Sequence, residues 1–181
     1  MTKRTADVLK MKDGMLFLGG NRMLVLNHDY TLAMYTSLRK LVGPVAKTIL
    51  YTSAKNAAST FIEPLLKEKI IKKVLLKTEL GQKKAIETVL AKFYVLTGLG
   101  LVKLISFSKE EIIIRSWNCS FSNDKGIEDL DEIGCLTNRA IIEGAISTLL
   151  NKPYKAKETK CVLWGNKYCE IHLTLGKKND K

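Results

Sequence analysis

Three cysteines and one glutamate in the C-terminal third of the chain have the types and spacing of a metal site. Cys135, Glu158, Cys161 and Cys169 form the pattern C-x22-E-x2-C-x7-C. Three thiolates and a carboxylate are donors that tetrahedral zinc accepts. Spacing alone leaves two alternatives open, a disulfide and buried free thiols, because cysteine clusters serve all three purposes in different compartments.

The elements that carry these four residues must meet two conditions. Cys135 falls near the start of a helix predicted over Ile133–Leu150, where the helix dipole stabilises a thiolate. The other three lie on a terminal hairpin predicted from strands 154–163 and 168–175. Glu158 and Cys161 are three residues apart, so a straight strand would place them on opposite faces. The sequence therefore predicts a bend or bulge at Glu158. To bring the sulfurs of Cys161 and Cys169 to one face, the hairpin needs a three- or five-residue loop centred on Gly165, or a bulge.

The rest of the chain predicts an α+β protein in which an antiparallel sheet packs on helices. A hairpin is expected over 15–26, around a Gly-Gly-Asn turn. Asn27 is an N-cap candidate for a helix over 30–42. Further helices are expected at 45–62, where Pro64 interrupts the pattern, and at 82–96, and the basic, apolar segment 65–80 is compatible with helix. Strands follow at 101–107 and 111–120, and 122–131 reads as a polar loop.

Length and composition predict one globular domain over residues 1–181. The 181 residues are 46% hydrophobic and 27% charged, and no apolar stretch approaches the ~20 residues of a membrane span. The N-terminus lacks an apolar leader, so we expect a cytoplasmic protein. The net charge of +12 comes with many lysines and glutamates and a single glutamine. This balance is typical of thermophiles, and a polyanion-binding surface is the alternative.

The stretch 135–173 resembles the C-terminal signature of the 4-vinyl reductase domain family. The resemblance rests on a cysteine that opens a helix, a glycine within that helix, an E-T-x-C motif, a glycine turn and a Y-C pair. Here these are Cys135, Gly144, Glu158-Thr159-Lys160-Cys161, Gly165 and Tyr168-Cys169. We expect the signature part to span 133–176 and the source to be a thermophilic archaeon.

This resemblance implies a fold like that of TRAPP vesicle-tethering subunits and haem–nitric-oxide domains, and a structural zinc ion held by Cys135, Glu158, Cys161 and Cys169. It also implies a homodimer and a small-molecule sensor without catalytic activity. Family members that sense aromatic compounds carry aromatic pocket residues where this chain has Arg139 and Ala156. We therefore do not expect an aromatic ligand.

The residues leave three function classes open. The first is a zinc-stabilised regulatory domain whose apolar ligand lies between helices and sheet, shielded by Phe93, Phe107 and Trp117. The second is a TRAPP-like interaction module, and the third is a basic, transcription-associated nucleic-acid-binding protein. No catalytic arrangement involves His28 or His172, so an enzyme is not expected. The remaining cysteine, Cys119, is predicted to be a buried small apolar residue.

The N-terminal elements predict how the chain pairs with itself. The hairpin at 15–25 is apolar on both sides of its turn, and helix 30–42 carries a wider apolar arc than one buried stripe requires. We expect these two elements to form the interface of a two-fold symmetric homodimer. The alternative is that both apolar surfaces are buried within one subunit.

Overall fold

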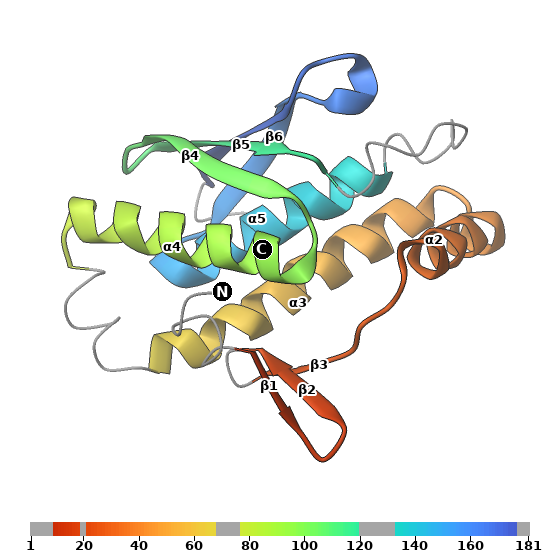
Figure 1. Ribbon diagram of the computed structural model, residues 1–181. Coiled ribbons are helices and arrows are strands. Elements are labelled where there is room, and N and C mark those ends of the chain that lie inside the picture. Colours follow the sequence, from red (N-terminus) through yellow and green to blue (C-terminus); the bar gives the residue numbers. More distant parts are fainter. Residues whose placement is uncertain (1–8, 19–20, 68–76, 120–132, 177–181) are drawn as a thin grey trace.

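The computed structural model describes residues 9–18, 21–67, 77–119 and 133–176. Its main sheet has four antiparallel strands in the order β4-β5-β7-β6 (Figure 1). The strands are β4 (Leu101–Phe107), β5 (Glu111–Trp117), β6 (Tyr154–Lys160) and β7 (Cys169–Leu175). One face of this sheet packs on helices, so the predicted α+β class with an antiparallel sheet on helices is confirmed.

Two helices cover the inner face of the sheet and a third packs behind them. These are α5 (Ile133–Leu150), which contacts β6 and β7, α4 (Glu79–Thr97), which packs on β4, and α3 (Val45–Lys67), which packs on α5. Side chains on β5 alternate strictly: Ile112 and Ile114 are buried toward α5, whereas Arg115 on the outer face stays partly exposed. This alternation lets the sheet have one dry face and one wet face.

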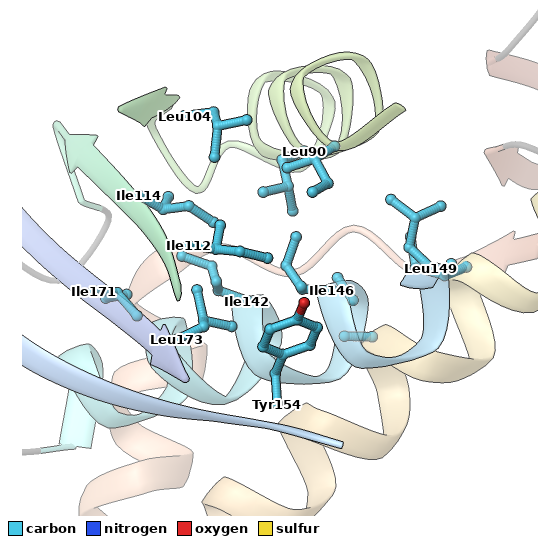
Figure 2. Close-up of a cluster of buried hydrophobic side chains, with 14 of the residues drawn as sticks. Leu90, Leu104, Ile112, Ile114, Ile142, Ile146, Leu149, Tyr154, Ile171 and Leu173 are labelled. Atoms are coloured by element: carbon cyan, nitrogen blue, oxygen red, sulfur yellow. The ribbon is translucent and has the colours of Figure 1, made fainter. Parts of the chain in front are cut away.

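The core lies between α5, α4 and the sheet (Figure 2). Its fully buried members include residues from β5, β7 and α5: Ile112, Ile114, Ile142, Ile146, Ile171 and Leu173. Burial of each such side chain contributes about 1.5–3 kcal/mol. Because the core joins all these elements, the residues at their ends are held in fixed positions relative to one another.

Helices α3 and α5 approach each other closely at Gly144. A Cβ at this position would overlap the backbone carbonyl oxygen of Lys55. The hydroxyl of Ser59 donates to the carbonyl of Gly144 at 3.5 Å. Small residues of these two helices therefore lie at their contact.

The N-terminal part forms a separate layer. Strands β1 (Leu9–Lys12), β2 (Met15–Leu18) and β3 (Asn21–Met23) make a small antiparallel sheet on the side of α3 that faces away from the main sheet (Figure 1). Helix α2 (His28–Val42) follows, and Asn27 caps it by accepting a 2.8 Å hydrogen bond from the Tyr30 N–H. This cap confirms the prediction for Asn27.

Several predicted boundaries were wrong. Helix α3 continues through Pro64 to Lys67, because Ile62 and Leu66 on either side pack into the core and offset the hydrogen bond that proline cannot make. The strand predicted over 154–163 ends at Lys160. Strand β1 was not predicted at all. The predicted loop 122–131 and most of the segment 65–80 lie outside the described residues.

No described helix combines the length and the apolar character that crossing a lipid bilayer would need.

Candidate metal centre

The four predicted ligands come together at the edge of the core. Cys135 lies in the first turn of α5, Glu158 on β6, Cys161 just after β6, and Cys169 at the start of β7. One donor atom from each lies within 4.8 Å of the donor atoms of the others. We call these four residues the Cys/Glu cluster. Residues up to 34 positions apart in the chain thus share one site.

Sulfur–sulfur separations in the Cys/Glu cluster approach those of a tetrahedral site. The Sγ of Cys169 lies 3.8 Å from that of Cys135 and 3.9 Å from that of Cys161. Sulfurs that share one zinc with bonds of about 2.3 Å are separated by about 3.8 Å. The third pair, Cys135 and Cys161, is closer at 2.8 Å. None of the four cysteines is part of a disulfide in this structure.

A β-bulge turns the carboxylate of Glu158 toward the sulfurs. Glu158 pairs with Ile171 and Lys160 pairs with Glu170, so Thr159 is an extra residue in β6. The hydroxyl of Thr159 donates to the Glu170 carbonyl at 3.2 Å and holds the bulge in place. The predicted bend at Glu158 is confirmed. Because Glu158 and Cys161 are an odd number of residues apart, a bulge is needed for both side chains to face the same site.

The loop after β6 brings Cys161 and Cys169 to one side. Residues Val162–Trp164 form a short 3-10 helix that ends at Gly165, whose φ of 84° favours glycine. The Cys161 N–H donates to the side-chain oxygen of Asn166 at 3.0 Å, and the Val162 N–H donates to the Cys169 sulfur at 3.5 Å. This loop is longer than the predicted three or five residues. The Val162 N–H of this loop stabilises negative charge on Cys169.

Burial makes negative charge in the Cys/Glu cluster energetically costly. Cys161 and Cys169 are fully buried. Burial, followed by the negative charge of Cys169, raises the pKa of Glu158 to about 7. The Oε1 of Glu158 is buried without a hydrogen-bond partner. An unpaired buried carboxylate oxygen beside three sulfurs fits a bound cation, because a metal ion would satisfy it and offset the negative charge.

Cys119 lies beside the cluster, a position that the sequence did not predict. It follows β5 and is buried, as predicted. Hydrogen bonding with Cys119 is the largest of the effects that raise the pKa of Cys135. It is also the largest of the effects that lower the pKa of Cys169. Register explains this placement, because Ser116 pairs with Cys169 and so brings the end of β5 to the site. Only knowledge of the strand order could have identified it.

Ion pairs and cation–π contacts on the outer face of the sheet stabilise the strand that carries Cys169. Glu170 accepts from Arg115 at 2.7 Å and pairs with Lys160 at 3.3 Å. Burial favours the neutral carboxyl, but the hydrogen bonds from Arg115 and Lys160 outweigh it and lower the pKa of Glu170 to about 2. The Tyr168 ring lies 4.5 Å from the Arg115 guanidinium and 5.1 Å from the Lys160 ammonium. Lys160 therefore neutralises Glu170 on the outer face.

Buried polar side chains tie the helices to the sheet near the cluster. Tyr94 of α4 donates to Asn138 of α5, and the Asn138 amide donates to Ser116 of β5 at 3.2 Å. All three residues are buried. Because each polar group has a partner, this chain of hydrogen bonds fixes how α4, α5 and β5 meet. Sequence reasoning missed it.

The three predicted ligand-binding aromatics occupy different environments. The Phe93 ring lies 4.7 Å from that of Phe61, and Phe107 packs at the end of β4 against the core. Trp117 lies on the outer sheet face, with its ring 5.9 Å from that of Tyr168. Strand alternation places Trp117 on the face opposite to Ile114 and Ser116, so the sheet separates its side chain from the helices.

The pockets described in the molecule are lined by other residues. One of about 250 Å³ lies between the N-terminal halves of α3 and α5. One of about 240 Å³ lies between α4 and β4. One of about 650 Å³ lies at the C-terminal ends of α3 and α5.

Comparison with known proteins supports the resemblance found in the signature. Residues 125–175 match the V4R domain family. An uncharacterized protein from Methanocaldococcus jannaschii is 32% identical over 88 residues, which cover 49% of this chain and 46% of that protein. The chain thus matches about half the length of this curated relative.

Solved structures share the fold at low sequence identity. The phenol-responsive sensory domain of the transcription activator PoxR, solved with phenol, has a TM-score of 0.73 at 15% identity, with 95% of this chain and 87% of that chain covered. Subunit 3 of a trafficking protein particle complex from Naegleria fowleri, covalently bound to palmitic acid, has a TM-score of 0.61 at 17% identity, with 83% and 93% covered. An H-NOX domain from Shewanella oneidensis has a TM-score of 0.51 at 9% identity, with 87% and 78% covered.

These likenesses confirm the predicted relation in fold to TRAPP subunits and haem–nitric-oxide domains. Residues 125–175 are thus similar to the V4R domain family, and this matched segment includes all four members of the Cys/Glu cluster.

Proposed function

We propose that this protein is a zinc-stabilised sensor domain that binds a small molecule and has no catalytic activity of its own. The observation that carries the proposal is the Cys/Glu cluster, which joins α5, β6 and β7 within the V4R segment. These elements also contribute side chains to the core, so a metal there would fix the position of α5 relative to β6 and β7.

Zinc is the metal that this donor set favours. Thiolate ligands select zinc over harder cations such as magnesium and calcium, and four protein donors complete a tetrahedron. A complete tetrahedron leaves no position for a reacting water, so the role is structural. The ion would link the start of α5 to the terminal hairpin and satisfy the buried oxygen of Glu158.

The sensor role draws on the neighbours in fold. The PoxR domain is described as phenol-responsive and the Naegleria subunit as bound to palmitic acid, so this fold accommodates small organic molecules in both proteins. The present chain has a pocket of about 250 Å³ between α3 and α5, beside the first turn of the helix that carries Cys135. A ligand there would act on the same helix that the metal holds.

A TRAPP-like interaction module is the second candidate, and exposed apolar residues favour it. Met11 on β1 is 77% exposed, Leu24 and Val25 after β3 are 78% and 77% exposed, and Leu41 on α2 is 82% exposed. Exposed apolar side chains of this kind favour contact with a partner surface. We propose that the N-terminal layer forms a homodimer interface, which is compatible with a sensor role.

The basic surface leaves nucleic acid as a further partner class. A net charge of +12 predicts weak, salt-sensitive binding even without sequence readout. A steep fall in affinity for DNA between low and physiological salt would support non-specific attraction only. Sequence-selective binding at physiological salt would favour the transcription-associated alternative.

Native mass spectrometry of protein purified without added metal tests the zinc assignment. We expect one zinc ion per chain and a fall in Tm of about 5–10 °C after removal with a chelator, because metal binding contributes to folding. Readdition of zinc should restore the Tm, whereas magnesium should not. Protein with no bound metal and an unchanged Tm in chelator would contradict the proposal.

A further inference from the structure

The pocket between α3 and α5 has a positively charged lining. Its residues are Lys47, Thr48, Tyr51, Thr52, Leu136 and Arg139. Lys47 lies in the first turn of α3 and Leu136 in the first turn of α5, so both helices begin at this end of the molecule. The positive ends of two helix dipoles therefore add to the two basic side chains.

Arg139 is the most unusual group in this pocket. Its guanidinium stacks over the Tyr51 ring, with 5.2 Å from its central carbon to the ring centroid. Its Nε is buried and has no hydrogen-bond partner. Within the part of the chain that the structure describes, Arg139 forms no ion pair. A buried guanidinium nitrogen without an acceptor is rare, because arginine in such places almost always meets a carboxylate or phosphate.

The nearest acidic side chain on the same helix already has its partners. Glu143 accepts from the Tyr51 hydroxyl at 2.5 Å, from the Lys55 ammonium at 2.8 Å and from the Ala156 N–H at 2.7 Å. Lys55 balances its charge. Glu143 is therefore already compensated by Lys55, and the positive charge of Arg139 favours an anion in the pocket.

We propose that this pocket binds a small organic carboxylate through Arg139. The planar guanidinium matches a carboxylate, and the hydroxyls of Thr48 and Thr52 are further donors at the wall. The apolar part of the ligand would pack on Leu136. A volume of about 250 Å³ is below the usual ~300–1,000 Å³ of pockets for drug-sized ligands, so the ligand is small.

The two other pockets described above lack this combination. The larger one, of about 650 Å³, is lined by Glu63 and Lys152, which carry opposite charges, and it lies where α3 and α5 end. Among the described residues, Arg139 and Glu158 each have a buried side-chain atom without a hydrogen-bond partner, and of these two residues Arg139 lines one of the three pockets. This inference rests on the proposed sensor function and names its ligand class.

Calorimetry on the full, zinc-loaded chain tests the proposal. The probes are acetate, butyrate and benzoate, each paired with its neutral amide, together with phenol and inorganic phosphate. We expect at least one carboxylate to bind about tenfold or more tightly than its amide. Arg139→Gln should weaken that binding about tenfold or more, because it removes the charged fork. Arg22→Gln, the same substitution on exposed β3, should leave it unchanged.

Each other outcome overturns the carboxylate assignment in a distinct way. Carboxylates that bind no better than their amides, or equally well to Arg139→Gln, exclude this site. Tight phosphate binding with weak carboxylate binding would assign another anion. Phenol binding that survives in Arg139→Gln would overturn the proposal and leave the sensor function standing, whereas the zinc measurement tests the metal separately. If Arg139→Gln does not fold, Leu136→Phe, which fills the pocket, should abolish carboxylate binding.

Discussion

At the scale of single residues, the described contacts of the Cys/Glu cluster leave its carboxylate without a counter-charge. Glu158 keeps one buried oxygen without a partner, and its pKa is raised to about 7 by burial and by negative charge at Cys169. These are the features of a carboxylate that lacks its counter-charge. A metal ion bound there would supply that charge and favour the ionised form.

We predict that Cys169→Ser abolishes stoichiometric zinc binding, because three donors remain and serine is a poor zinc ligand. The expected loss is about 3 kcal/mol or more in the free energy of unfolding, or roughly 5–10 °C in Tm. Metal analysis and thermal unfolding measure both effects.

Cys119→Ser is the matched control, since Cys119 is equally buried but stands outside the set of four mutually close donors. This variant should retain one zinc per chain. Loss of zinc in Cys119→Ser together with its retention in Cys169→Ser would show that the ligand set is different.

At the scale of secondary-structure elements, α3, α5 and β6 are joined by Glu143. This residue lies on α5, is almost completely buried, and accepts from Tyr51 and Lys55 of α3 and from the backbone of β6. Burial alone would raise its pKa, but the hydrogen bonds from Lys55, Tyr51 and Ala156 outweigh burial and lower it. Glu143 therefore stabilises the fold in its ionised form.

We predict that Glu143→Gln lowers the free energy of unfolding at pH 7 by about 2–3 kcal/mol, because Lys55 loses its buried partner. The folded-state pKa of Glu143 is below the unfolded value, so its contribution is complete above about pH 4.5 and declines as the pH falls further. Denaturant unfolding at pH 7 and at pH 3.5 should show the difference from the parent protein shrinking at the acid pH. Glu87→Gln, on the exposed side of α4, should show no difference at either pH.

The close contact of α3 and α5 makes a second element-scale prediction. Gly144→Ala should destabilise the protein by about 1–3 kcal/mol, although alanine is the better helix former, because the new methyl group overlaps the Lys55 carbonyl. Ala57→Val, which enlarges an exposed position of α3, should cost less than about 0.5–1 kcal/mol. Equal stability of Gly144→Ala and the parent protein would mean that the helices can separate at no cost.

At the scale of the whole molecule, the N-terminal layer is poorly covered. Strand β1 is exposed along its whole length, and in α2 only Leu32 is buried. Leu38 packs with Leu32 and Leu50, so part of the predicted apolar arc is satisfied within one chain. The remainder, on β1, after β3 and at the end of α2, faces outward.

We predict a homodimer that uses this outward surface, and Leu41→Asp should shift it to monomer. Leu41 is 82% exposed, so the charge disturbs no contact within the chain. Light scattering coupled to gel filtration at micromolar concentration measures the mass. Val95→Asp, at a 60% exposed position of α4, should leave the dimer intact. A monomeric mass for the parent protein at every concentration would end this prediction.

Local patterns in the sequence, together with the family resemblance, were sufficient for much of the fold and for the members of the Cys/Glu cluster. The spacing of Cys135, Glu158, Cys161 and Cys169 indicated the donors, and the odd interval between Glu158 and Cys161 required the bulge that Thr159 provides. These features depend on strand alternation, which acts within a few residues of the chain. The same holds for the cap at Asn27.

Contacts between distant parts of the chain were decided only by the tertiary structure. Cys119 reaches the cluster because β5 pairs with β7, and Glu143 meets Tyr51 across 92 positions of sequence. Trp117 was predicted near a ligand but lies on the outer face, since alternation does not say which face meets the helices. The buried Nε of Arg139, which has no hydrogen-bond partner, likewise follows from how α3 packs on α5. Which surfaces meet is set by the packing of the whole core, and no local pattern contains that information.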